Sequence, residues 1–250
     1  KKGGETSEEA MERSLASVAK ILNDHPQEIA ALIVEPIQGN GGIQVPHIRY
    51  FKKLQQLLHD AGALLIVDEV QTGYGRTGKN FAIEHYNIIP DILTSAKALG
   101  NGVPIAAFST KDEIAAGFTS PSASTLGGNP VSAANSIAVL NYLESHQLKE
   151  RAGNLGKLLM EKLSKLKEEY PLIADVRGIG LMVGAELKNA DGSPASEAVD
   201  QILEIMKNHG FLIGKNGIDR NVLAFQPPLI ISKTDILNMI AALESALKTI

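Results

Sequence analysis

The sequence contains no cysteine, no long apolar run and no marked surplus of either charge. Without cysteine, the chain has no disulfide, no thiolate nucleophile and no cysteine-rich metal site. No apolar run approaches the roughly 20 residues that a membrane-spanning helix requires. Lysine and arginine total 24 against 28 aspartate and glutamate residues, so neither nucleic acid nor an anionic membrane is indicated as a partner. Small-molecule chemistry in a cytoplasmic protein is the expectation that remains.

Histidine is present but scattered along the chain. The six histidines are His25, His47, His59, His85, His146 and His209. No two of them have the i, i+4 spacing that would place two ligands on one face of a helix, so a zinc site is not expected.

The first part of the chain predicts an α/β domain. Two apolar runs, Ile29–Val34 and Ala63–Val67, are typical of strands that are buried on both faces of a parallel sheet. Between them, Ile48–Ala61 carries apolar residues at helical spacing and ends at Gly62, which completes a β-α-β unit. Further predicted elements are a helix over Glu8–Leu22, strands over Ile92–Ser95 and Ile105–Ser109, and a helical region over Ala133–Leu143 that continues through Leu148–Lys167.

A smaller α+β domain is predicted from residue 145 onwards, where helices alternate with short strands. Its predicted elements after the charged helix are a strand-like segment over Gly180–Leu187, a helix over Ser196–Asn208, apolar runs at Phe211–Ile213 and Val222–Phe225, and a final helix from Lys233. We therefore predict two domains, residues 1–144 and 145–250. Because the sequence opens without methionine and leads at once into a helix, we also expect it to be the carboxyl-terminal portion of a longer protein.

Three predicted strands end at a chemically distinctive residue, namely Glu35, Asp68 or Lys97. In open α/β sheets, ligands collect at the carboxyl ends of the strands. Taken singly, each acid could be a helix cap or a loop charge, and Lys97 could extend into solvent or pair with a carboxylate. Asp68, however, follows a strongly apolar strand and needs a positive partner, which could be Lys97 or a protonated ligand nitrogen.

The glycine-rich stretch from Asp68 to Gly78, DEVQTGYGRTG, predicts a tight loop directly after the second strand. Together with PDILTSAKALGNGVPIAAF it resembles the signature of the class III, pyridoxal-phosphate-dependent aminotransferases. The resemblance extends from IVEPIQG, which contains Glu35, through STLGGNP, which contains Thr125, to VLAFQPPL near the end of the chain. It implies a fold-type-I α/β architecture, in which part of a large domain with a mostly parallel sheet is followed by a small α+β domain.

The resemblance also implies roles for individual residues. Lys97 would form the Schiff base with the cofactor aldehyde and carry the substrate proton. Asp68 would hold the pyridine nitrogen protonated, and Val70 and Gln71 would contact the ring face and the ring hydroxyl. Thr125 would bind the cofactor phosphate of a neighbouring subunit, which makes the expected assembly a homodimer with shared sites.

Ala224 departs from the pattern of many family members, which have arginine at this position and use it to bind a substrate carboxylate. Glu35 resembles the acid that screens or releases that arginine, and here it lacks this partner. The resemblance therefore favours pyruvate or glyoxylate as amino acceptor over α-ketoglutarate.

The family's phosphate loop and the aromatic residue that covers the other ring face would precede Lys1. Arg177, in RGIG, resembles a structural residue at the start of a small-domain strand.

Three functions stay open on these grounds. The first is a ping-pong transaminase that moves the amino group of an ω-amino acid, amine or alanine-like donor to an oxo acid. The second keeps the cofactor and changes the reaction to racemisation or phospholyase elimination, because the same cofactor serves several reactions. The third is a non-catalytic fragment or subunit that needs an amino-terminal partner.

Overall fold

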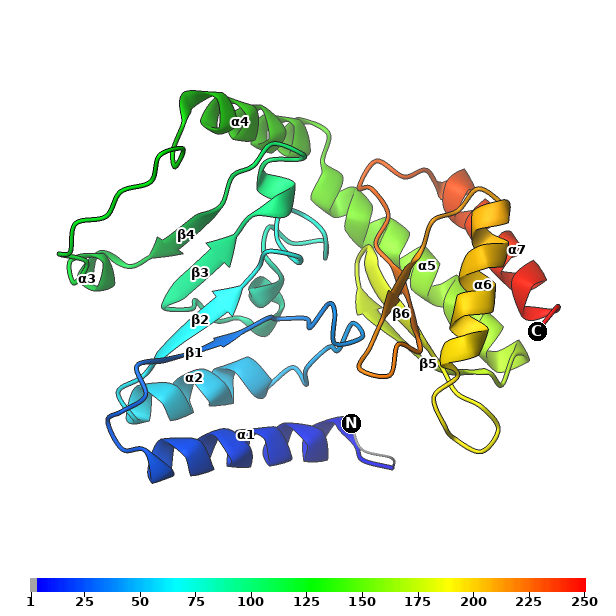
Figure 1. The fold of residues 1–250 in the computed structure, drawn as a ribbon, viewed down its shortest axis with the longest axis horizontal. Coiled ribbons are helices and arrows are strands. Elements are labelled where there is room, and N and C mark those ends of the chain that lie inside the picture. Colours follow the sequence, from blue (N-terminus) through cyan, green and yellow to red (C-terminus); the bar gives the residue numbers. More distant parts are fainter. Residues whose placement is uncertain (1–3) are drawn as a thin grey trace. The chain divides into compact units, whose positions relative to one another are not determined.

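Two four-stranded sheets organise the chain, one in each of two compact units (Figure 1). The computed structural model describes residues 4–250. The first unit takes in the residues up to Pro36, Pro46–Tyr74 and Phe81–Ser145, and the second takes in Ile37–Val45, Gly75–Asn80 and His146–Ile250. The predicted division into domains between residues 144 and 145 stays a prediction. The two units differ from it in one respect, since the short segments 37–45 and 75–80 belong to the second unit.

The sheet of the first unit is mostly parallel, as the sequence predicts. Its strands are β1 (Ala31–Val34), β2 (Leu64–Asp68), β3 (Ile92–Ser95) and β4 (Ala107–Thr110), in that spatial order. The first three run parallel and β4 runs antiparallel to β3. The apolar run of β2 places Leu65 and Val67 in the core, where neither is exposed. This arrangement brings the carboxyl ends of three strands to one edge.

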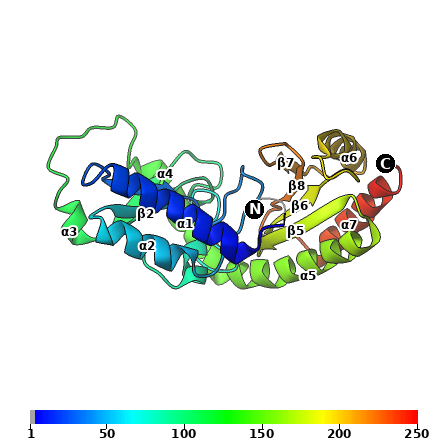
Figure 2. The same cartoon turned by 90° about the horizontal axis from the view of Figure 1, so that it is seen from below.

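Amphipathic helices cover the sheet of the first unit. α1 (Ser7–Asp24) and α2 (Tyr50–Asp60) lie side by side (Figure 2), and their apolar residues share a core with β2. α1 begins at a capping box formed by Thr6 and Glu9. The remaining elements of the unit are the short helix α3 (Asp112–Ala115), α4 (Pro130–Ser145) and two 3₁₀ turns, η1 (Ala82–Tyr86) and η2 (Lys97–Leu99).

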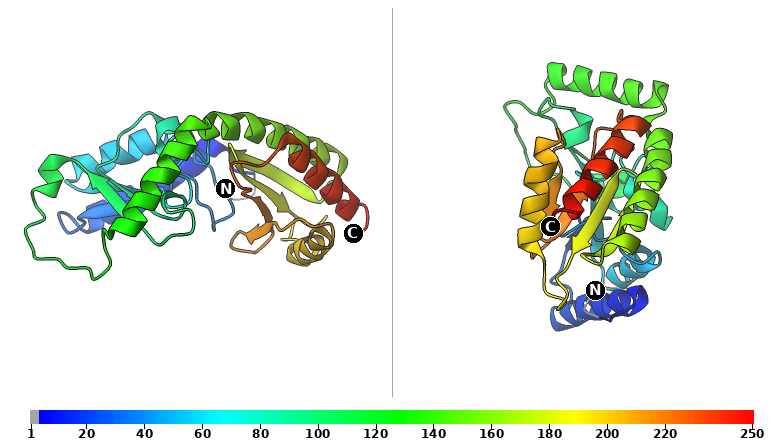
Figure 3. Two further views of the ribbon diagram at one scale, coloured as in Figure 1. Left: turned by 90° about the horizontal axis from the view of Figure 1, so that it is seen from above. Right: turned by 90° about the vertical axis from the view of Figure 1, so that its right-hand side faces the viewer.

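The second unit packs three helices on an antiparallel sheet (Figure 3). Its strands are β5 (Ile173–Ile179), β6 (Met182–Leu187), β8 (Val222–Phe225) and β7 (Gly214–Asn216), in that spatial order. The helices are α5 (Leu148–Glu169), α6 (Ser196–Asn208) and α7 (Lys233–Leu247), and their apolar faces share one core with the sheet. This is the α+β character that the sequence predicts.

The apolar run Phe211–Ile213 does not form a strand. Phe211 and Ile213 pack against the core from irregular chain, while Leu212 is 87% exposed. The residues that pair with β8 are the next three, Gly214–Asn216. The apolar run therefore does not mark the residues of β7.

Asp91 links three elements of the first unit at the edge where β3 begins. The residue is 3% exposed. Its Oδ2 accepts hydrogen bonds from the Leu65 backbone N–H at 2.9 Å and from His59 Nε2 at 2.8 Å, and its Oδ1 accepts one from Lys111 Nζ at 3.2 Å. Burial raises the pKa of this carboxyl group, but the hydrogen bonds outweigh burial and the net shift is downward.

Asp91→Asn should lower the free energy of unfolding of the full-length protein by about 2–3 kcal/mol at neutral pH, because the amide loses charge-assisted bonds and turns a donor towards other donors. The carboxyl pKa is lower in the folded than in the unfolded state. The stabilisation is therefore present above the ordinary aspartate pKa and is lost as pH falls through the lowered value. Urea unfolding between pH 7 and about pH 3 measures both effects.

Asp60, which is exposed at the end of α2, provides the control for this prediction. Asp60→Asn should change the free energy of unfolding by no more than about 0.5 kcal/mol, as is usual for a surface substitution. A deficit of the Asp91→Asn protein that stayed constant down to acid pH would contradict the assignment of this stabilisation to the carboxylate.

Candidate functional site

The carboxyl ends of β1, β2 and β3 define the candidate site in the first unit. In the parallel register, Val34 pairs with Val67 and Asp68 pairs with Thr94. Glu35 therefore follows β1 at the level where Asp68 ends β2, and Lys97 follows two residues after the end of β3. The structure thus places the three predicted residues at one edge of one sheet.

Asp68 is half-buried and is oriented by two hydrogen bonds. The Val70 backbone N–H donates to its Oδ1 at 2.9 Å, and Thr94 Oγ1 donates to the same oxygen at 3.2 Å. The second carboxyl oxygen, Oδ2, takes part in neither bond. Thr94 was missed by sequence reasoning, and the only signal for it was its place opposite Asp68 on the neighbouring strand. The result is a fixed carboxylate that can accept a further hydrogen bond from a ligand.

Lys97 begins a strained turn directly after β3. Its φ of 41° lies in the left-handed region, which costs a non-glycine residue free energy and is concentrated at functional positions. The turn is closed by hydrogen bonds from Gly100 N and Asn101 N to the Lys97 carbonyl oxygen, both at 3.0 Å. Asn135 Nδ2, on α4, donates to the Gly100 carbonyl oxygen at 2.6 Å. The backbone is held on both sides while the Lys97 side chain stays exposed.

Glycine is required within this turn at position 100. A Cβ atom added to Gly100 would lie 2.0 Å from the Val103 carbonyl oxygen. Any other residue would therefore open the turn that positions Lys97. The motif AKALGNG combines the lysine with the glycine that its backbone geometry needs.

Val70 and Gln71 lie in the loop that follows β2, and both are half-buried. The Gly73 backbone N–H donates to the Glu69 carbonyl oxygen at 2.9 Å, which closes the loop into a turn. Tyr74 Oη donates to Ser95 Oγ, on β3, at 2.9 Å. The loop is therefore connected to the same strand that leads to Lys97.

Glu69 is a buried acid to which the sequence analysis gave no role. It is 0% exposed, and burial raises the pKa of its carboxyl group. Its position directly after Asp68 was visible in the sequence, but its hydrogen-bond partners come from residues further along the chain.

Thr125 and Ala224 are not brought to this edge by regular structure. Thr125 lies in the exposed loop that precedes α4. Ala224 is on β8 of the second unit, is 3% exposed and packs with Ile37, Ile43 and Met182. The roles predicted for both residues stay predictions.

Arg177 is held inside the second unit. Its guanidinium group donates to the Gly42 carbonyl oxygen at 2.6 and 2.9 Å, to Asp175 at 2.9 Å and to Glu186 at 2.6 Å. These bonds fasten the segment 37–45 to the sheet of this unit, which agrees with a structural residue.

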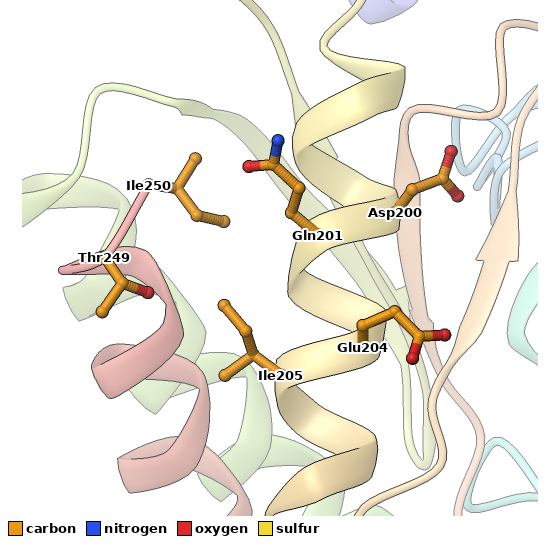
Figure 4. A pocket seen from close by; sticks show the side chains of 6 residues that line it. All are labelled: Asp200, Gln201, Glu204, Ile205, Thr249 and Ile250. Carbon is orange, nitrogen blue, oxygen red and sulfur yellow. The ribbon is translucent and has the colours of Figure 1, made fainter.

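A shallow groove of about 510 Å³ lies between α6 and the end of the chain in the second unit (Figure 4). It is lined by Asp200, Gln201, Glu204, Ile205, Thr249 and Ile250. Its two acids are already paired, Asp200 with Lys215 and Glu204 with Lys207. None of the predicted site residues lines it. Within residues 4–250, no cluster of acidic, histidine or cysteine side chains is arranged to hold a metal ion, and no helix of this range is long and apolar enough to cross a membrane.

The sequence matches a family model over residues 2–247, and that family is described as aminotransferase class III. One similar protein is a leucine/methionine racemase of Thermococcus litoralis, 44% identical over 226 residues, which are 88% of this chain and 50% of the racemase. Another is an acetylornithine aminotransferase of Methanocaldococcus jannaschii, 44% identical over 216 residues, which are 86% of this chain and 52% of that enzyme.

The fold matches solved aminotransferase structures. An aminotransferase of Bacillus anthracis superposes with a TM-score of 0.89 at 35% identity, covering 94% of this chain and 56% of that protein. The chain spans about half the length of the curated relatives that it matches.

Proposed function

The chain belongs to the class III aminotransferase family, and from this premise we propose that it carries the lysine and the ring-binding acid of a transaminase. Enzymes of this family depend on pyridoxal phosphate. The amino donor would be an ω-amino acid, an amine or an alanine-like amino acid, and the acceptor an oxo acid, with pyruvate or glyoxylate favoured. The observation that carries the proposal is that Asp68 ends β2 and Lys97 lies two residues after β3, at the same edge of two neighbouring parallel strands.

The side chains at this edge fit pyridoxal phosphate by their chemistry. A carboxylate, an amide and a primary amine, on Asp68, Gln71 and Lys97, are the groups needed for the protonated pyridine nitrogen, the ring hydroxyl and the aldehyde of this cofactor. When bound, the cofactor supplies an electron-withdrawing ring that stabilises negative charge on the substrate carbon. Asp68 would accept the hydrogen bond of the pyridine nitrogen and keep that nitrogen protonated. Lys97 would hold the cofactor through its aldehyde, and its Nζ would carry the substrate proton during the reaction.

We further propose a cytoplasmic homodimer in which Thr125 reaches the cofactor phosphate of the second copy. The support is the exposure of apolar side chains on α4 and in the loop before it. Leu126 and Val131 are 75% and 74% exposed, and Ile137 is also exposed, whereas Ser132 and Ser136 are buried. Apolar side chains gathered on an exposed helix are typical of a surface that is covered in an assembly. Sedimentation velocity of the complete enzyme tests the dimer, and a monomer would contradict it.

Racemisation is the second candidate function, and the match to a leucine/methionine racemase favours it. Both reactions use the removal of a proton from the substrate carbon, and they differ in where a proton returns. The complete enzyme should transfer the amine of alanine or of an ω-amino acid to an oxo acid, measured as new amino acid formed from the acceptor. If the enzyme instead converted one enantiomer of the amino acid into the other with no oxo acid present, and transferred no amine, it would be a racemase.

The acceptor preference depends on Ala224. We expect pyruvate or glyoxylate to be preferred over α-ketoglutarate, because the family's carboxylate-binding arginine is absent and Glu35 should repel a dicarboxylic acceptor. Ala224→Arg should shift the ratio of kcat/KM values towards α-ketoglutarate by roughly one to two powers of ten, the contribution of a charge-assisted bidentate pair. An acceptor panel on the complete enzyme and on this variant measures the shift.

Ala224→Met is the matched control, because Ala224 packs among Ile37, Ile43 and Met182 and any long side chain will disturb that cluster. Methionine adds comparable length without charge, so it should lower activity towards all acceptors without favouring the dicarboxylic one. A clear preference of the unmodified enzyme for α-ketoglutarate would mean that another cation binds the second carboxylate.

A further inference from the structure

The side chain of Glu69 is completely enclosed, although Asp68 beside it lies at the edge formed by the carboxyl ends of β1, β2 and β3. We call this edge the ligand edge of the sheet. Its Oε2 accepts hydrogen bonds from Thr72 Oγ1 at 2.5 Å and from the Ala82 backbone N–H at 2.9 Å. Its Oε1 accepts one from the Ile83 backbone N–H at 2.7 Å. The two carboxyl oxygens thus receive three hydrogen bonds, and two of the donors are backbone groups at the start of η1.

The backbone of Glu69 is fixed as well. Its N–H donates to the Thr94 carbonyl oxygen at 2.9 Å, and its own carbonyl oxygen accepts the Gly73 N–H at 2.9 Å. Gly73 fits closely here, since an added Cβ would lie 3.0 Å from the Glu69 carbonyl oxygen. One residue therefore connects β3, the turn that follows β2 and the start of η1.

These bonds enclose the two residues predicted to contact the cofactor ring. Val70 and Gln71 are the only residues between Glu69 and Thr72, and the side chains of Glu69 and Thr72 are bonded to each other. The Val70 N–H is in turn bonded to Asp68 Oδ1. A change at Glu69 would therefore reach Val70 and Gln71 through the backbone, without any contact between Glu69 and a ligand.

We propose that Glu69 is a positioning residue for pyridoxal phosphate, which holds Val70 and Gln71 in the geometry needed to contact the cofactor ring. This inference rests on the proposed function of the same site. The acid is required in its charged form, because all three of its partners act as donors towards it. Glutamine has the same shape but replaces one acceptor oxygen with a donor, which in either orientation of the amide would face a backbone N–H, that of Ala82 or that of Ile83.

Glu69→Gln in the complete enzyme tests the proposal, with Asp91→Asn as the matched control. Asp91 is also a buried acid that accepts three hydrogen bonds in the first unit, but it lies where β3 begins and not at the ligand edge. Titration of the apo enzymes with pyridoxal phosphate gives Kd, and we expect a rise of roughly tenfold for Glu69→Gln. The pH midpoint of the bound cofactor's absorbance band should move by about half a unit or more. Asp91→Asn should change stability but neither of these quantities.

Thr72→Val removes one of the three bonds and decides the matter if Glu69→Gln does not fold. It should raise Kd by a few-fold and move the absorbance midpoint in the same direction as Glu69→Gln. If Kd and midpoint stayed at the values of the unmodified enzyme in every folded variant, Glu69 would be a structural residue only, and the proposed function would stand. If the unmodified enzyme bound no pyridoxal phosphate, the proposed function itself would fail and the positioning role with it.

Discussion

Lys97→Ala should abolish turnover of the complete enzyme while leaving its fold intact. The side chain is exposed, so its removal leaves no cavity, and alanine meets the same left-handed backbone geometry as lysine. What is lost is the amine that would bind the cofactor aldehyde and carry the substrate proton. Proton transfer by a positioned group alone contributes about 10²–10⁴-fold, and covalent attachment adds to it. We expect kcat to fall by about 10⁴ or more, measured alongside far-UV circular dichroism.

Lys52→Ala is the control for this substitution, because Lys52 is exposed on α2 in the same unit and has no predicted role. It should keep the native rate. Borohydride reduction of the holoenzyme, followed by peptide mapping, should place the cofactor on Lys97. A label on any other lysine would show that the assignment is wrong, whatever the rate of the alanine variant.

Two strands of the first unit, β1 and β2, could be predicted because each comes from a continuous apolar run. β1 lies within Ile29–Val34, and β2 (Leu64–Asp68) overlaps all of Ala63–Val67 except Ala63. The expected burial on both faces is wrong for β1, because Ile33 is 62% exposed. β5 was not predicted from the sequence, since Asp175 and Arg177 interrupt its apolar pattern. These two side chains pair with each other, and Arg177 also pairs with Glu186 on β6, so the charges are compensated by tertiary contacts. No local pattern in the sequence shows such compensation.

The candidate site also has residues that could be predicted from the sequence and residues that could not. The positions of Asp68 and Lys97 at one edge of the sheet could be predicted because both lie at the carboxyl ends of predicted strands, whereas their chemical roles stay predictions. The residues that orient them could not, because their contacts depend on the fold. Thr94 reaches Asp68 only through the parallel register of β2 and β3, and Asn135 reaches the turn of Lys97 only because α4 packs beside η2. Ordinary threonine and asparagine side chains carry no sign of this in the sequence.

Asp68→Asn should keep part of the cofactor affinity and lose most of the activity. An amide oxygen can still accept the bonds from the Val70 N–H and Thr94 Oγ1, so the loop and strand geometry should persist. A neutral amide cannot hold the proton on the pyridine nitrogen, and without that proton the ring withdraws electrons poorly. Loss of a charge-assisted interaction with the developing charge contributes a few kcal/mol, so kcat should fall on the order of a hundredfold or more.

Thr94→Val separates the charge of Asp68 from its orientation. Valine removes one hydrogen bond to Oδ1 and leaves the carboxylate charged, so the loss should be that of one ordinary hydrogen bond, about 1 kcal/mol or a few-fold in kcat. The two variants should therefore differ by more than tenfold if charge on the ring nitrogen is what matters. Steady-state rates at saturating cofactor make the comparison, because they remove the difference in cofactor affinity. A near-native rate for Asp68→Asn under those conditions would mean that Asp68 serves the loop after β2 and not the ring, and the electron-withdrawing role would have to lie with another residue.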